Sequence, residues 1–185
     1  MTADPEDLVV GLNIPARIGM SIEDVATPAL IVDLDAFERN VWTMRDRLRA
    51  ADVRLRAHAK THKSVDIAHF QIEHGGACGI CCQKVAEAEA MVAGGVEDVM
   101  VSNQVVDPAK IKRLAKLATR ARILVCVDDS DNVDALSAAA QAERVTLECL
   151  VEIDCGAGRC GVAPGPDVVG RAEKIAACPG LTFSG

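Results

Sequence analysis

Residues 122–154, RILVCVDDSDNVDALSAAAQAERVTLECLVEID, contain two apolar runs of strand length on either side of a helical pattern. The runs ILVCV and LECLVEI are largely apolar, which is typical of parallel strands covered on both faces. Between them, Ser130 precedes apolar residues at Val133 and Leu136, as at the start of a helix. This strand–helix–strand order predicts an α/β fold with a parallel sheet.

The same unit repeats outward in both directions from this stretch. Asp107-Pro108 predicts the start of one helix, and Gly94-Gly95 predicts the end of another. Each predicted strand except the last is followed by a helical pattern, and the strands are expected to begin near Arg54, Ala77, Asp98, Arg122, Leu147 and Leu181.

Upstream of these units, a short strand is predicted at Ala29–Val32, and a helix follows it. Asp35 and Glu38 have the spacing of a capping box. The apolar face of this helix is predicted to consist of Phe37, Val41, Met44 and Leu48. We assign residues 1–27 to a leader segment and residues 28–185 to the sheet-containing domain.

One polar residue lies at or just past the carboxyl end of most predicted strands. An open doubly wound sheet would spread such residues along a crest, whereas a (β/α)8 barrel gathers them around one mouth, where its enzymes carry out their chemistry. The pattern therefore favours an incomplete (β/α)8 barrel with about six strands in this chain. The residues concerned are Lys60, Gln83, Asn103, Asp128 and Asp154.

Composition excludes several classes of protein. The chain has 185 residues, 50% of them hydrophobic, and a net charge of −7, which disfavours nucleic acid as a partner. The sequence has neither a membrane-spanning apolar run nor a signal peptide, so we expect a cytoplasmic protein without a membrane partner. The eight cysteines are expected to be reduced. Cys78 and Cys81 form a C-x-x-C, but no second pair follows at zinc-site spacing, so we assign no metal ligands.

Lys60 lies in a basic run, RLRAHAKTHKS, at the end of the first barrel strand. Neighbouring cations and partial burial favour a neutral lysine amine, which is the nucleophile that a carbonyl group needs to form a Schiff base. The alternative to a catalytic Lys60 is that this basic run is only a solvated, charged surface. His58 and His62 flank the strand end, where ring stacking or proton relay is open to them.

The stretch EIDCGAGRCGV, Glu152–Val162, matches a dinucleotide-type G-x-G-x-x-G. Such a fingerprint leads straight into a helix and has an acidic residue about 20 positions further on. Here VAPGPD interrupts, and the next strand, LTFSG, ends without an acid. We interpret Gly156 and Gly158 instead as permitting a tight backbone bend that presents Arg159 to a ligand.

Four motifs in this order resemble the fold-type III pyridoxal phosphate enzymes, the alanine racemase-like barrels: TPALIVDLD, HAKTHK, CCQKVAEAEAM and VEIDCGAGRCGV. Within these enzymes the chain is most similar to the branch of D-threonine aldolase, D-3-hydroxyaspartate aldolase and eukaryotic-type D-serine dehydratase. The resemblance implies that Lys60 is the Schiff-base lysine and that Arg159 lies near the phenolic oxygen of the cofactor. It also implies that Asp154 orients the glycine loop and that Gln83 and Asn103 face the cofactor.

The resemblance further implies an aldolase that cleaves Cα–Cβ of a D-3-hydroxy amino acid with pyridoxal 5'-phosphate and a divalent metal. The substrate is expected to be D-3-hydroxyaspartate or D-threonine. A dehydratase acting on D-serine or 3-hydroxyaspartate, a racemase, and a non-catalytic cofactor-binding barrel stay open as alternatives. The metal ligands, the rest of the barrel and a C-terminal β domain, which the strand at residues 29–32 should join, are expected outside these residues. The full-length enzyme is expected to be a homodimer.

Overall fold

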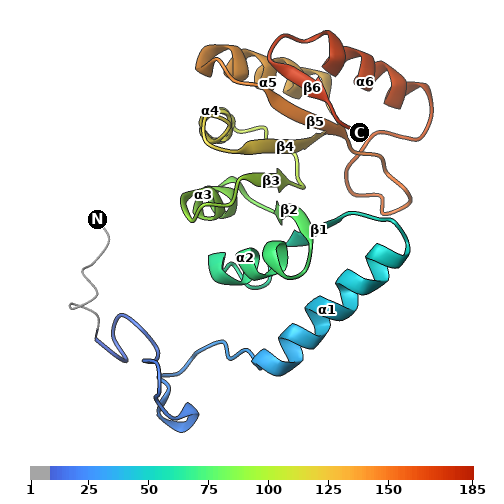
Figure 1. The fold of residues 1–185 in the computed structure, drawn as a ribbon. Coiled ribbons are helices and arrows are strands. Elements are labelled where there is room, and N and C mark those ends of the chain that lie inside the picture. Colours follow the sequence, from blue (N-terminus) through green and yellow to red (C-terminus); the bar gives the residue numbers. More distant parts are fainter. Residues whose placement is uncertain (1–8) are drawn as a thin grey trace. The chain divides into compact units, whose positions relative to one another are not determined.

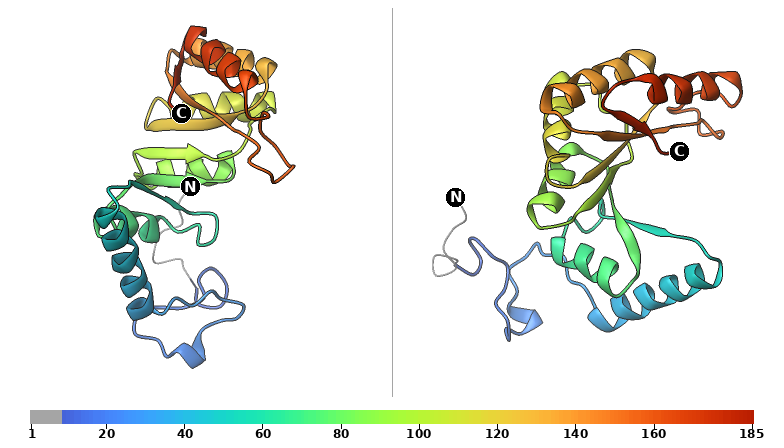
Figure 2. Two further views of the ribbon diagram at one scale, coloured as in Figure 1. Left: turned by 90° about the vertical axis from the view of Figure 1, so that its right-hand side faces the viewer. Right: turned by 45° about the horizontal axis from the view of Figure 1, so that its top comes forward.

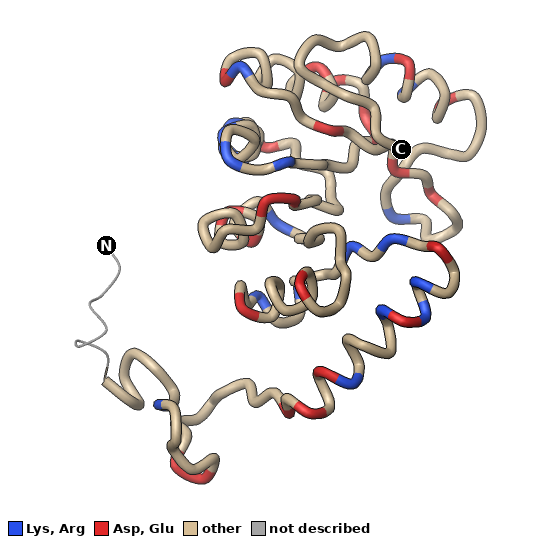
Figure 3. Tube along the Cα trace, viewed as in Figure 1, with Lys and Arg blue, Asp and Glu red and all other residues tan. Residues whose placement is uncertain are grey.

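The computed structural model describes residues 9–185 and divides the chain into two compact units, Met1–Asn40 and Val41–Gly185. The predicted leader, residues 1–27, therefore lies partly outside the described residues. In the first unit, Ser21 caps a short 3-10 helix, η2 (Ile22–Asp24). Helix α1 (Leu34–Ala50) begins in the first unit and ends in the second. Both acidic and basic residues are spread along it (Figure 3).

Two predictions for this amino-terminal region are wrong. Residues 29–32 form no strand, because no neighbouring strand within the described residues pairs with them. The helix is capped by Asp33, whose Oδ1 accepts a hydrogen bond from Ala36 N at 2.9 Å, and Asp35 lies inside the first turn. The carboxylate of Asp33 satisfies one of the amide groups that a helix leaves free at its amino end.

The second unit alternates strand and helix, which confirms the predicted α/β class (Figure 1). All six strands are parallel and pair in chain order, so β1 and β6 are the outer strands of the sheet in the described part of the chain. The strands are β1 (Leu55–His58), β2 (Ala77–Cys82), β3 (Asp98–Val101), β4 (Arg122–Val127), β5 (Leu147–Val151) and β6 (Leu181–Phe183). The helices are α2 (Val65–Glu73), α3 (Val85–Ala93), α4 (Pro108–Leu117), α5 (Ser130–Glu143) and α6 (Pro166–Ala177).

The apolar core lies between the sheet and these five helices, which follow one face of the curved sheet (Figure 2). On that face the strands present fully buried side chains such as Ile80, Val99 and Ile123. Each large apolar side chain buried in this way contributes roughly 1.5–3 kcal/mol. The helices contribute Met91, Leu114, Leu136 and Ile175 to the same core.

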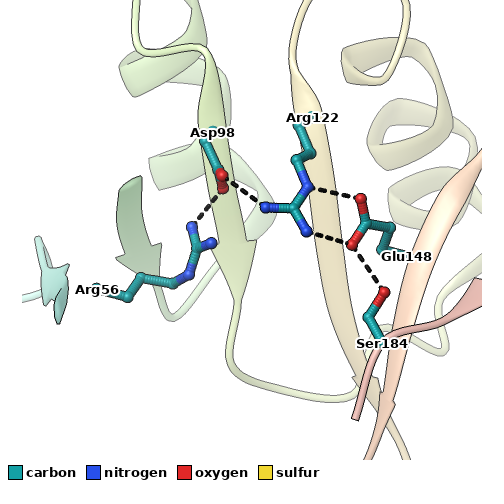
Figure 4. A network of polar contacts seen from close by, with 5 residues as sticks. All are labelled: Arg56, Asp98, Arg122, Glu148 and Ser184. Atoms are coloured by element: carbon teal, nitrogen blue, oxygen red, sulfur yellow. Dashed lines mark hydrogen bonds and ion pairs between the residues drawn. The ribbon is translucent and has the colours of Figure 1, made fainter. Parts of the chain in front are cut away.

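The opposite face carries a chain of ion pairs near the amino ends of the strands (Figure 4). Arg56 is paired with Asp98, and Arg122 Nη1 lies 2.9 Å from Asp98 Oδ2. Arg122 also donates two hydrogen bonds of 2.6 Å to Glu148, which accepts a third from Ser184 Oγ at 2.7 Å. The hydrogen bonds that Arg122 donates to Glu148 and then to Asp98 raise the pKa of Arg122, and the same bond to Glu148 lowers the pKa of Glu148. The alternating charges thereby cross-link β1, β3, β4 and β5.

Gly79 of β2 makes this chain of ion pairs possible. A Cβ at this position would lie 2.7 Å from Asp98 O and would also collide with the Arg56 guanidinium. The absence of a side chain therefore lets Arg56 reach across β2 to Asp98.

Candidate active site

The opposite, carboxyl ends of the strands carry the polar residues singled out in the sequence. Because all the strands are parallel, the loops that follow them lie at one edge of the sheet. Gln83 and Asp128 directly follow β2 and β4, and the others lie slightly further along their loops. The prediction that these residues gather at one end of the sheet is confirmed for Lys60, Gln83, Asn103, Asp128 and Asp154.

Lys60 lies in a tight turn that backbone and ring atoms hold to the end of β1. Ala59 N donates to Cys81 O at 2.8 Å, and Lys63 N donates to Ala59 O at 2.8 Å. Lys60 N donates to His58 Nδ1 at 3.2 Å. The Lys60 side chain is exposed, and within residues 9–185 no hydrogen bond or ion pair engages its amine. The amine is therefore accessible to a ligand at this edge of the sheet.

The basic run around Lys60 is not a cluster of free cations, which corrects one reason for the prediction. Arg56 points to the other end of the barrel strands and pairs with Asp98. Lys63 Nζ lies 2.9 Å from Glu87 Oε1. Two of the neighbouring positive charges are thus compensated by carboxylates that are distant in the sequence.

His62 is a half-buried neutral ring beside this turn. Its Nδ1 accepts a hydrogen bond from Ser64 N at 3.0 Å, so the proton of the neutral ring lies on Nε2. Burial lowers the pKa of His62. The ring therefore orders the start of α2, where Ser64 Oγ caps the helix by accepting from Ile67 N.

The glycine loop, Glu152–Val162, folds back on itself. Asp154 Oδ1 accepts hydrogen bonds from Gly156 N at 2.9 Å and Gly158 N at 3.0 Å. The bond from Gly158, followed by the bond from Gly156, lowers the pKa of Asp154. Asp154 N donates to Val162 O at 3.0 Å. Asp154 therefore orders the loop, as the resemblance implied, while its contact with a cofactor stays a prediction.

Gly161 shows why the glycine spacing is not a dinucleotide fingerprint. Its φ is +102°, and a Cβ there would lie 2.6 Å from Asp154 N. Its own N–H donates to Asp128 Oδ2 at 2.9 Å, which ties the loop to the end of β4. Helix α6 begins only at Pro166. The glycine serves the closure of the loop and does not begin a helix.

Arg159 lies on this loop between two anchored residues. Its side chain is exposed, and the adjacent Cys160 raises its pKa. Cys160 Sγ donates to Glu152 Oε1 at 3.0 Å, and Gln104 Nε2 donates to Glu152 Oε2 at 2.7 Å. Glu152 thereby joins the loop after β3 to the Arg159 loop. Sequence reasoning missed Gln104 and Glu152 in this role, since their pairing spans two loops.

Gln83 and Asn103 line one cavity of about 360 Å³ between the loops after β2 and β3. Its wall also includes the basic residues Lys84, Lys110 and Arg113. Lys60 and Arg159 do not line this cavity, so the described residues divide the predicted set between separate loops. Contact of Gln83 and Asn103 with a cofactor stays a prediction.

Two further features concern metal and membrane. Within residues 9–185, no three His, Cys, Asp or Glu side chains are arranged to hold a metal ion. None of the described helices combines the length and apolar character that crossing a membrane requires.

The sequence and the fold correspond to one family. The model of the alanine racemase N-terminal domain matches residues 32–185, and the chain belongs to this family of fold-type III pyridoxal phosphate enzymes. The chain is 54% identical over 177 residues to the 3-hydroxy-D-aspartate aldolase of Paracoccus denitrificans (strain Pd 1222), covering 95% of this chain and 46% of the relative. The chain thus spans about half the length of the curated relatives that it matches.

Solved structures agree with this assignment. The crystal structure of D-threonine aldolase from Filomicrobium marinum superposes with a TM-score of 0.89 at 52% identity, covering 92% of this chain and 46% of that one. D-threo-3-hydroxyaspartate dehydratase from Delftia sp. HT23 gives a TM-score of 0.78 at 30% identity, covering 87% of this chain and 42% of that one. The predicted fold, part of an alanine racemase-type (β/α) barrel, is confirmed.

Proposed function

We propose that this chain is the amino-terminal half of a pyridoxal phosphate-dependent aldolase. The whole enzyme would cleave the Cα–Cβ bond of a D-3-hydroxy amino acid, and 3-hydroxy-D-aspartate is the first candidate substrate, with D-threonine second. The observation that carries this proposal is the 54% identity to a 3-hydroxy-D-aspartate aldolase over 95% of the chain. The products would be glycine and glyoxylate.

The residues at the carboxyl ends of the strands fit the cofactor chemically. Lys60 offers a primary amine that has no partner within the described residues, and Arg159 offers an exposed guanidinium on a braced loop. Lys60 would hold the cofactor covalently, and Arg159 would donate to its phenolic oxygen. Gln83, Asn103 and Asp154 would contact the cofactor from the neighbouring loops. When bound, pyridoxal phosphate supplies an electron sink for the charge left on Cα.

The same proposal includes a divalent metal, a cellular compartment and an oligomeric state. A divalent metal that polarises the β-hydroxyl group would take its ligands from outside the described residues, because these provide no ligand cluster. All eight cysteines are free, which supports a reducing compartment such as the cytoplasm. The homodimer stays a prediction.

A dehydratase is the second candidate. The similarity to the Delftia D-threo-3-hydroxyaspartate dehydratase favours it, because that enzyme shares this part of the fold at 30% identity. A dehydratase would convert the same substrate to oxaloacetate and ammonia.

The test uses the full-length protein with 3-hydroxy-D-aspartate, pyridoxal phosphate and a divalent metal, followed by identification of the products. Glycine and glyoxylate are expected, whereas oxaloacetate and ammonia would move the assignment to the dehydratase. Borohydride, which fixes a carbonyl cofactor to the amine that holds it, should label Lys60. A label on Lys63 or Lys84 would overturn the assignment of Lys60.

A further inference from the structure

Glu87 lies in the first turn of α3 and joins two loops of the candidate site. Its side chain is 9% exposed, and its Oε1 lies 2.9 Å from Lys63 Nζ. Its Oε2 accepts hydrogen bonds from Gln83 N at 2.9 Å and Lys84 N at 3.3 Å. Burial acts to raise the pKa of Glu87, but the bonds from Lys63 and Gln83 N lower it overall, so the carboxylate is charged at neutral pH.

Lys63 is the last residue of the turn that carries Lys60. Its φ of +51° is in the left-handed region, which a residue with a side chain adopts only where its surroundings hold it. Its backbone N–H closes the turn on Ala59 O at 2.8 Å. The ion pair to Glu87 therefore acts on the residue whose backbone conformation closes this turn.

We propose that Lys63 and Glu87 are positioning residues for Lys60. The ion pair fastens the Lys60 turn to the end of β2. It acts at Lys63, the residue of the turn that has the unfavourable left-handed backbone conformation. This inference rests on the proposed role of Lys60 as the residue that holds the cofactor. Neither Lys63 nor Glu87 needs to contact the cofactor to have this effect.

Two substitutions separate this role from the capping of α3. Lys63→Met removes the ion pair but leaves the bonds from Glu87 to Gln83 N and Lys84 N in place. Lys63→Arg keeps a positive charge and should restore the parent behaviour. Glu89→Gln is the matched control, because Glu89 lies on the same helix and pairs with Arg113, outside the Lys60 turn.

The first measurement is amide hydrogen exchange of the peptide containing residues 59–64 in the cofactor-free, full-length protein. Lys63→Met should accelerate exchange by about fivefold or more, since the closing hydrogen bond opens more often. Lys63→Arg and Glu89→Gln should leave it within about twofold of the parent protein. Exchange in Lys63→Met equal to the parent would overturn the proposal.

The second measurement is equilibrium binding of pyridoxal phosphate, followed by its visible absorbance. Lys63→Met should weaken binding by about tenfold, and Lys63→Arg should recover most of this loss. Tight binding in Lys63→Met despite faster exchange would also overturn the positioning role. If the parent protein carries no borohydride label on Lys60, the proposed function fails, whereas the exchange result still decides whether the ion pair holds the turn.

Discussion

At the residue scale, two histidine rings also order the chain around Lys60. His58 and His62 each use Nδ1 to accept a backbone N–H, from Lys60 and from Ser64 respectively. A ring nitrogen that accepts a hydrogen bond carries no proton, so both rings are fixed in the tautomer with the proton on Nε2 when neutral. For His62, this neutral form is also the one that burial favours.

His62 should therefore make the folded protein less stable on acidification. Its folded pKa lies below the ordinary histidine value of 6.5, so at pH values under about 6.5 the unfolded state binds a proton that the folded state excludes. Between pH 7.5 and 5.5, the unfolding free energy of the parent protein should fall as the pH falls. In His62→Gln the slope of this fall should be smaller by up to about 1.4 kcal/mol per pH unit. Urea unfolding at pH 7.5, 6.5 and 5.5 measures this slope.

The exposed His74 provides the control for this experiment. His74→Gln removes an exposed ring and shows whether the loss of any histidine changes the slope. A slope for His62→Gln equal to that of the parent would contradict the assignment of a half-buried, neutral His62.

At the element scale, β2 depends on a residue without a side chain. Gly79→Ala would place a methyl group 2.7 Å from Asp98 O and against the Arg56 guanidinium, which forces apart β2, β3 and the ion pair. We expect a loss of about 1–3 kcal/mol in unfolding free energy, as for other overpacked sites. Thermal and urea unfolding of the purified protein would measure it.

Gly170 of α6 is the matched glycine, because nothing lies within 4 Å of a Cβ built there. Gly170→Ala should stabilise the protein by roughly 0.5–1 kcal/mol, since alanine is the better helix former. Equal destabilisation by both substitutions would show that space around Gly79 is not the cause.

The elements also show what the sequence could predict. Five of the six predicted strand starts match the structure, and β1 begins at Leu55, next to the expected Arg54. These starts could be predicted because an apolar run bounded by helical patterns is a local signal in the sequence. Residues 29–32 have the same apolar character without becoming a strand. A strand requires a paired neighbour, and the composition of the segment alone does not provide one.

The candidate site was predictable to the same extent. Lys60, Gln83 and Asp128 could be placed because each follows a strand end, which is visible in the sequence. The partners that hold the loops could not be placed, because Lys63–Glu87 and Gln104–Glu152 join residues that are far apart in the sequence. No periodicity links such pairs. The signal for Glu87 was its place in the first turn of a helix, where a glutamate commonly accepts backbone N–H groups.

At the scale of the whole molecule, the sheet of the second unit has two outer strands in this chain. β1 pairs only with β2, and β6 pairs only with β5, among the described residues. Closed barrels leave no such edges, and unpaired N–H and C=O groups on an edge strand are a template for pairing with another chain. The face that carries the ion pairs, opposite the helices, also carries half-buried apolar side chains at Met100 and Leu150.

We therefore expect the 185-residue chain, expressed alone, to self-associate and to show no aldolase activity with pyridoxal phosphate and metal. Association should depend on the β6 edge, so Thr182→Lys, which adds a charge at an exposed edge position, should reduce it. Size-exclusion chromatography with light scattering, thermal unfolding and product analysis test these expectations. A monodisperse monomer that melts cooperatively and turns over 3-hydroxy-D-aspartate would contradict them, because it would mean that six strands form a complete catalytic unit without closing the barrel.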